Sequence, residues 1–326
     1  MASPQNQSPN GCKIEFEAVC GAYRFIGMRT SVLLLLLTFT VGAASPRFSI
    51  LQMERLKKET RIAIMEGKTN VALAKADALI NLDKEFPEFW YFRATLLERY
   101  SQYDKAISDA KEYLRLKKNA PDAHQYLGTL YFKNSQFTES VKEFREVTKL
   151  QPEHKAEHWQ LGISLYYAGL AAEGRDQFEL HQTVNTGDLE NAAWHFLCVA
   201  AAESPEKARE KLIKIGPDSR IPMMKLYDFY KGQAKEEEVL AATEVGEPTR
   251  KDRRERLFYA HLYLGLYYDA VGDLKKALHH IELAANEYRP EFNYMGDVAR
   301  VHLPHLKKRM AASETKSSSQ TSEQKP

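Results

Sequence analysis

The chain has 326 residues, of which 44% are hydrophobic and 28% charged, and its formal net charge at pH 7 is +2. This composition suits a soluble globular protein with a large core. The near-neutral charge gives no electrostatic reason to expect nucleic acid as a partner. No stretch alternates apolar and polar residues over several β-branched positions, so a sheet is disfavoured.

The first 44 residues are interpreted as an N-terminal extension followed by a secretory signal peptide. Arg29 gives a short positive region, residues 31–41 are mostly apolar, and Gly42, Ala43 and Ala44 form a small-residue exit. We expect cleavage after Ala44, and we suspect that translation begins at Met28. The apolar run is shorter than the roughly 20 residues that span a bilayer. An exported protein, periplasmic or envelope-associated and without a stable membrane span, is therefore expected, and a retained anchor is the alternative.

Cysteines add little to this picture. Cys12 and Cys20 precede the expected cleavage point, so Cys198 alone would remain in the mature protein. No internal disulfide is then available.

From residue 60 onward, small residues recur with a period of 34. They stand in pairs 12 residues apart: Thr60 and Ala72, Ala94 and Ala106, Gly128 and Ser140, Gly162 and Gly174, and, later, Gly265 and Ala277. Two antiparallel helices can approach closely only where facing side chains are small, and larger apolar residues then fill the space around the crossing. A 34-residue period therefore predicts stacked helical hairpins.

Turns and prolines fall between the expected helices. The stretches RYSQYD, KNSQFT and DAVGDL separate the first helix of a hairpin from the second, and Pro87, Pro121, Pro152 and Pro290 lie between hairpins. The stretches HQYLGTLYFKNSQFTESVKEFREVTKLQP and HLYLGLYYDAVGDLKKALHHIELA resemble the tetratricopeptide repeat (TPR) consensus over residues 53–290. This resemblance implies an all-α fold, an α-solenoid of stacked antiparallel hairpins.

The repeat is expected to fill residues 45–310 and to become irregular toward its C-terminal end. Residues 191–218 predict a shortened hairpin, and residues 243–254 a charged loop. A closing helix interrupted at Pro304 follows, and the polar segment 311–326 is predicted to be a disordered tail. The order of these segments is similar to that of the enterobacterial envelope adaptor family of new lipoprotein I, although the lipidated cysteine of that family is absent. That resemblance implies a role as an envelope adaptor.

No catalytic motif or phosphate-binding loop is present, and no cofactor is expected. His279 and His280 point about 100° apart on a helix and cannot easily share a metal ion, so no metal site is predicted. An enzyme with a site at Asp188, His195 and Cys198 is the least favoured alternative. Asp188 more plausibly caps a helix, and Cys198 more plausibly fills space in the core.

The first helix of each hairpin lines the concave side of a solenoid, and that side is the predicted binding surface for a protein or peptide partner. Its outward positions are Tyr91, Thr95, Gln125, Thr129, Phe132, Trp159, Ile163, Tyr166 and His195. TPR domains that grip a terminal carboxylate use lysine and asparagine, whereas Tyr91, Thr95, Thr129 and Ala156 stand at those positions here. Aromatic residues on a rigid wall favour an extended or helical peptide. Some of these aromatics could instead be covered by the next hairpin. A self-associating module that forms a homodimer is the other alternative.

Overall fold

The computed structural model describes residues 48–322, which belong to a compact unit that begins at Phe48. The predicted signal peptide, Cys12 and Cys20 lie outside the described residues. Residues 48–322 contain helices and no strand: α1 (Ile50–Met65), α2 (Thr69–Leu82), α3 (Pro87–Arg99), α4 (Tyr103–Lys117), α5 (Pro121–Lys133), α6 (Phe137–Leu150), the short 3-10 helix η1 (Pro152–Glu157), α7 (Trp159–Tyr167), α8 (Ala171–His181), α9 (Leu189–Ala202), α10 (Pro205–Glu210), α11 (Met223–Tyr230), α12 (Glu236–Ala242), α13 (Arg250–Ala270), α14 (Leu274–Glu282), the π-helical turn η2 (Leu283–Glu287) and α15 (Tyr294–Ser322).

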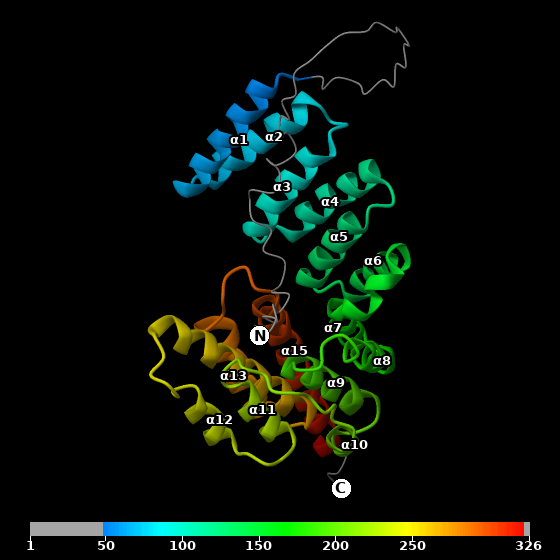
Figure 1. Ribbon diagram of the computed structural model, residues 1–326, viewed down its shortest axis with the longest axis vertical. Coiled ribbons are helices and arrows are strands. Elements are labelled where there is room, and N and C mark those ends of the chain that lie inside the picture. The colour runs from blue at the N-terminus through cyan, green and yellow to red at the C-terminus, as the bar shows by residue number, and fades with distance from the viewer. Residues whose placement is uncertain (1–47, 323–326) are drawn as a thin grey trace, which may run out of the picture. The chain divides into compact units, whose positions relative to one another are not determined.

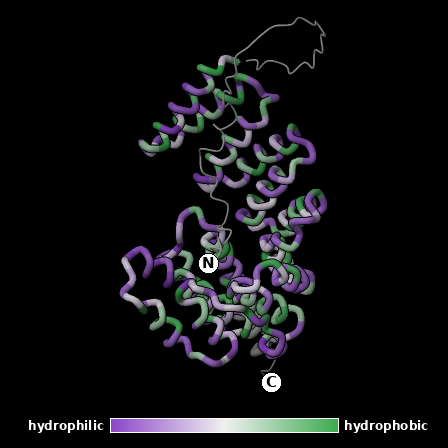
Figure 2. The backbone as a smooth tube through the Cα atoms, in the orientation of Figure 1, coloured by the Kyte–Doolittle hydropathy of each residue, from purple (hydrophilic) through white to green (hydrophobic). Residues whose placement is uncertain are grey.

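Helices pair as antiparallel hairpins, and the hairpins pack in the order of the sequence. The two helices of a hairpin lie against each other, as α1 with α2 and α3 with α4, and the second helix then contacts the first helix of the next hairpin. Figure 1 shows this succession, and Figure 2 shows that individual helices carry both hydrophilic and hydrophobic residues. The all-α fold class expected from the sequence is therefore confirmed.

The turns inside the hairpins repeat with the same period. Gly67, Ser101, Ser135 and Gly169 stand 34 residues apart, and each has a φ between 57° and 77°. This left-handed conformation costs little for glycine and more for a residue with a Cβ. The serines at two of the four positions show that the hairpin geometry, and not glycine itself, fixes the turn.

Small residues lie at the helix crossings, as the period predicts. A Cβ added to Gly128 would stand 2.6 Å from the ring of Phe144, and one added to Gly265 would stand 2.7 Å from Ile281. Ser140, twelve residues after Gly128, donates a hydrogen bond of 2.8 Å to the Gly128 carbonyl oxygen. The glycines are thus required because the partner helix fills the place of a side chain.

Toward the C-terminal end the hairpins lose their regular lengths. Helix α10 has six residues, and an irregular segment follows it. The loop predicted at 243–254 is shorter than expected, because α13 begins at Arg250. Thr249 caps that helix by accepting a hydrogen bond from the backbone N–H of Asp252, which explains why the charged residues after it are helical.

The last helix, α15, differs from the sequence prediction in two ways. It continues through Pro304 without an interruption, and it runs to Ser322, into the segment predicted to be a disordered tail. Val301 and Leu306, on either side of Pro304, are both buried in the core, so packing holds the two halves in one helix. Residues 323–326 lie outside the described part of the chain.

Candidate partner-binding surface

The nine residues predicted to bind a partner lie on the first helices of consecutive hairpins. We call the surface that they define the first-helix face: Tyr91 and Thr95 on α3, Gln125, Thr129 and Phe132 on α5, Trp159, Ile163 and Tyr166 on α7, and His195 on α9. Helical spacing places the residues of each helix on one side of it. The exposure of these residues divides the face into two parts.

The part on α3 and the first turns of α5 is partly accessible. The side chains of Tyr91, Thr95, Gln125 and Thr129 are half-buried. Each threonine hydroxyl donates to a carbonyl oxygen of its own helix, Thr95 to Phe92 and Thr129 to Gln125. Because these bonds are local, the side chains do not depend on another helix. This part offers an aromatic ring, two hydroxyls and an amide to a partner.

The part on α7, α9 and the end of α5 is closed. Phe132 and Ile163 are 0% exposed and His195 is 2% exposed, so a partner cannot reach these three residues in this structure. The ring of Tyr294, the first residue of α15, stacks on Phe132 at 5.1 Å and meets Trp159 edge-on at 5.0 Å. The chain's own closing helix therefore begins on the predicted binding surface.

Charged groups fix the start of α15 beside α5. Lys133 binds Glu98 of α3 at 2.6 Å and Asp297 of α15 at 2.9 Å. Burial lowers the pKa of Lys133, but the two carboxylates outweigh this effect and raise it to about 12. Arg300 donates a 2.8 Å hydrogen bond to the carbonyl oxygen of Lys133, an acceptor that the end of α5 leaves free. Helix α15 is thus bound to the first-helix face by charge as well as by ring packing.

A second polar chain holds α15 between α7 and α13. The hydroxyl of Tyr167 lies 2.9 Å from Nδ1 of His302, and Nε2 of the same ring lies 3.5 Å from Asp269. Arg309 donates to both oxygens of Asp269 at 2.6 Å. Burial lowers the pKa of His302 to about 3, so its imidazole is neutral at pH 7. Tyr167, His302 and Asp269 are all buried, so this group can hold helices together but offers no access to a substrate.

The three residues of the enzyme alternative have separate partners. Asp188 caps α9 by accepting a hydrogen bond from the backbone N–H of Glu190, and His195 lies 3.3 Å from Glu179. Cys198 is fully buried, and its Sγ lies 2.8 Å from the place that a Cβ on Gly174 would take. Burial raises the pKa of the thiol, which therefore stays protonated at pH 7. These contacts are those of a capping residue and a packing residue.

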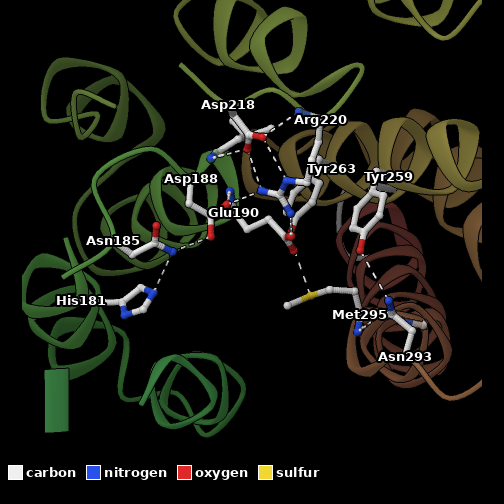
Figure 3. A network of polar contacts seen from close by, with 12 residues as sticks. His181, Asn185, Asp188, Glu190, Asp218, Arg220, Tyr259, Tyr263, Asn293 and Met295 are labelled. Atoms are coloured by element: carbon white, nitrogen blue, oxygen red, sulfur yellow. Dashed lines mark hydrogen bonds and ion pairs between the residues drawn. The ribbon is translucent and has the colours of Figure 1, made fainter. Parts of the chain in front are cut away.

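Sequence reasoning did not find the densest polar network, which surrounds Arg220 (Figure 3). The Arg220 guanidinium donates to Asp188 at 2.6 Å, to Glu190 at 2.5 Å and to Asp218 at 2.6 Å. Tyr263 donates to the other oxygen of Glu190, so the network connects α9, the segment before α11 and α13. Burial raises the pKa of Glu190, and the positive charge of Arg220 opposes that rise. No local pattern marks Arg220, because its three partners come from two distant segments.

The histidines of the last hairpin form a pair that the sequence also did not indicate. Nδ1 of His261 lies 2.8 Å from Nδ1 of His280, and Nε2 of His280 lies 3.3 Å from Glu236. Two imidazoles can share this contact only if one nitrogen carries a proton and the other does not. Within residues 48–322, no group of three or more His, Cys, Asp or Glu side chains is arranged to hold a metal ion.

The helices of residues 48–322 include none whose length and apolar character would suit a membrane span.

No protein-family model and no curated protein matches the chain. Solved structures similar to it include YrrB, described as a TPR protein with an unusual peptide-binding site, at 21% identity and a TM-score of 0.44 over 53% of this chain and 89% of that one. A TPR protein from Parabacteroides merdae is similar at 12% identity and a TM-score of 0.48, over 77% and 98%. MamA from Desulfovibrio magneticus is similar at 16% identity and a TM-score of 0.44, over 49% and 90%.

Proposed function

We propose that this chain is a non-catalytic TPR adaptor that binds a peptide segment of a partner protein on the open part of the first-helix face. The binding residues are Tyr91, Thr95, Gln125 and Thr129, with Trp159 at the border of the closed part. Phe132, Ile163, Tyr166 and His195 support this surface from beneath or beside α15.

The observation that carries this proposal is the way in which α15 itself lies on the same face. Tyr294 packs between an aromatic ring of α5 and one of α7, and Asp297 pairs with Lys133. The face therefore accommodates a helix through one aromatic anchor and flanking polar bonds, which is a recurring mode of peptide recognition. The adjoining part on α3 and α5 is built from the same helix positions and is not covered by Tyr294.

The test adds bulk to the open part without removing a packing residue. Peptides would be selected from a displayed random library on the wild-type protein, and the dissociation constant of a selected peptide would then be measured by fluorescence anisotropy. Thr95→Arg combined with Thr129→Arg is expected to weaken binding at least about tenfold, because two long side chains would occupy the peptide's place. Thr138→Arg, on the second helix α6, is the matched control and should leave binding unchanged.

If the double variant binds the selected peptides as tightly as the wild type, while its circular dichroism stays helical, the open part of the first-helix face is not the binding site. Equal weakening by Thr138→Arg would point to a general effect of added charge.

The second element of the proposal is export to the periplasm or cell envelope. It is supported by the order of Arg29, the apolar run 31–41 and the small residues 42–44, and by the similarity of the segment order to the new lipoprotein I family. The protein would be produced in a bacterial host, and the N-terminus of the protein in the periplasmic fraction would be sequenced. Export predicts a mature chain that begins at Ser45. A cytoplasmic chain that keeps residues 28–44 would contradict it.

A further inference from the structure

Exposed apolar side chains concentrate on the first hairpin. Of the ten exposed large hydrophobic residues found among residues 48–322, five lie on α1 and α2: Ile50, Leu51, Ile62, Met65 and Val71. Leu51 and Met65 are more than 80% exposed, and the other three are between 44% and 63% exposed. Single exposed apolar residues are ordinary, whereas a group of them on one hairpin marks an interaction surface.

The repeat itself shows what kind of surface this is. Residues 34 and 68 positions after Ile62 are Leu96 and Leu130, which are 2% and 0% exposed. Those leucines lie on α3 and α5, helices that pack against the second helix of the hairpin before them. Among residues 48–322 no hairpin precedes α1, so Ile62 presents the stacking surface of a hairpin without its usual neighbour.

A shallow hollow of about 280 Å³ lies between α1 and α2 at this place. Ile62, Ala63 and Val71 line it with apolar atoms, and four charged residues stand around them. These charges pair with one another: Lys75 with Glu59 at 2.7 Å, and Lys68 with Glu66 at 3.0 Å. The surface is therefore apolar and carries two positive and two negative charges.

We propose that this surface is the interface of a homodimer, in which the α1–α2 hairpins of two copies pack together about a twofold axis. The balance of charge favours a second copy as the occupant. In a twofold interface the same patch faces itself, and a patch of one sign would repel its copy, whereas acids and bases in equal number can pair across the axis. The apolar side chains of both copies would leave water together.

Such a dimer leaves the proposed peptide site on its own helices. Tyr91 and Thr95 lie on α3, and Gln125 and Thr129 on α5, whereas the dimer residues Ile62, Met65 and Val71 lie on α1 and α2. Loss of dimerisation and loss of peptide binding are therefore separate measurements, and either can fail without the other.

The test measures mass by sedimentation equilibrium over a wide range of concentration. Two chains would be compared, the full chain and a chain that begins at Ser45, since residues from Phe48 onward form a compact unit of their own. Both are expected to be dimers. Ile62→Glu combined with Met65→Glu should weaken association at least about tenfold, because four carboxylates would face one another across the axis.

Val184→Glu is the matched control, because Val184 is 54% exposed and lies far along the chain, after α8. It should leave the dimer intact, and circular dichroism should show that every variant stays helical. Monomers at all concentrations for both chains would overturn the proposal. A dimer only for the chain that begins at Ser45 would also overturn it, because the earlier residues would then be the occupant of the surface. A dimer that survives the Ile62→Glu and Met65→Glu changes would place the interface elsewhere.

Discussion

The three hairpins from α1 to α6 and the irregular helices from α7 to α15 are stabilised in different ways. In the first region the cores are small and separate, and each joins neighbouring helices, such as the cluster of Leu97, Ile107, Leu127 and Tyr131. In the second region one large cluster extends from Phe132 to Leu306. Its residues come from helices far apart in sequence, including α15.

This difference teaches how a repeat array can acquire a fixed end. Hairpins that contact only their neighbours contribute to stability additively, and each can open with little effect on distant ones. A core that gathers residues from α5 to α15 has to form as a unit. The regular hairpins therefore keep an open binding face, whereas the irregular region encloses its part of the same face.

Removal of α15 would break this comparison most strongly. A chain that ends after Pro290 lacks Tyr294, Val298, Val301 and His302, which are core residues or contact the first-helix face. We expect α7–α14 to lose protection from hydrogen exchange while α1–α4 keep theirs, because the large core loses one of its helices. A chain that ends after Ala312 is the control. Equal loss of protection in both regions would show that the array unfolds as one unit.

Acid should destabilise the irregular region first. Burial lowers the pKa of His158 and of His261 to about 4 and that of His302 to about 3, and it also lowers the pKa of His195 and His280. The unfolded chain takes up these protons near pH 6.5 and the folded chain does not. Stability is therefore full above pH 6.5 and falls as the pH decreases toward 4, by up to about 3 kcal/mol for each buried histidine.

Residues 50–123 contain no histidine, so α1–α4 lack this contribution. Hydrogen exchange measured at pH 7 and at pH 5 should show α13–α15 opening at the lower pH before α1–α4. Opening of α1–α4 first would contradict the assignment of acid sensitivity to the buried histidines.

Two arginines sharpen the comparison between the regions. Arg220 binds Asp188, Glu190 and Asp218 from two distant segments, whereas Arg93 binds Asp77 and Asp109 of the neighbouring helices α2 and α4. Arg220→Gln should lower the free energy of unfolding by about 3 kcal/mol, because three carboxylates, one of them buried, lose their counter-charge. Arg93→Gln leaves two carboxylates and should cost about 2 kcal/mol.

Urea unfolding measures both changes. Arg253→Gln, which breaks an exposed pair with Glu244, is the control and should change stability by less than about 1 kcal/mol. If all three variants lose the same amount, the number and burial of the carboxylates do not set the cost.

The crossing glycines give the smallest expected effect. Gly128→Val meets the ring of Phe144, a side chain that can shift, whereas Gly265→Val also approaches the backbone nitrogen of Ile281 at 3.1 Å. We expect a loss of about 1 kcal/mol for Gly128 and about 2 kcal/mol for Gly265 in urea unfolding. Gly216→Ala, with no atom closer than 3.7 Å to the added Cβ, should be nearly neutral. A larger loss at Gly128 would mean that Phe144 cannot move.

The sequence by itself determined the hairpin array. Small residues 34 apart, such as Gly128 and Gly162, predict helix crossings because close approach of two helices requires the absence of a side chain, a local condition that can be read from spacing. The same reasoning predicted Asp188 as a helix cap and Cys198 as a packing residue, since both roles depend on neighbours in the same or the adjoining hairpin.

Only the tertiary structure decided how much of the first-helix face is open. Helical spacing places Phe132 and Ile163 on that face, but it cannot show that Tyr294, more than 130 residues later, covers Phe132. The continuity of α15 through Pro304 and the contacts of Arg220 were hidden for the same reason. They depend on packing between segments distant in sequence, and the free energy of such contacts is set by which surfaces meet and not by any local periodicity.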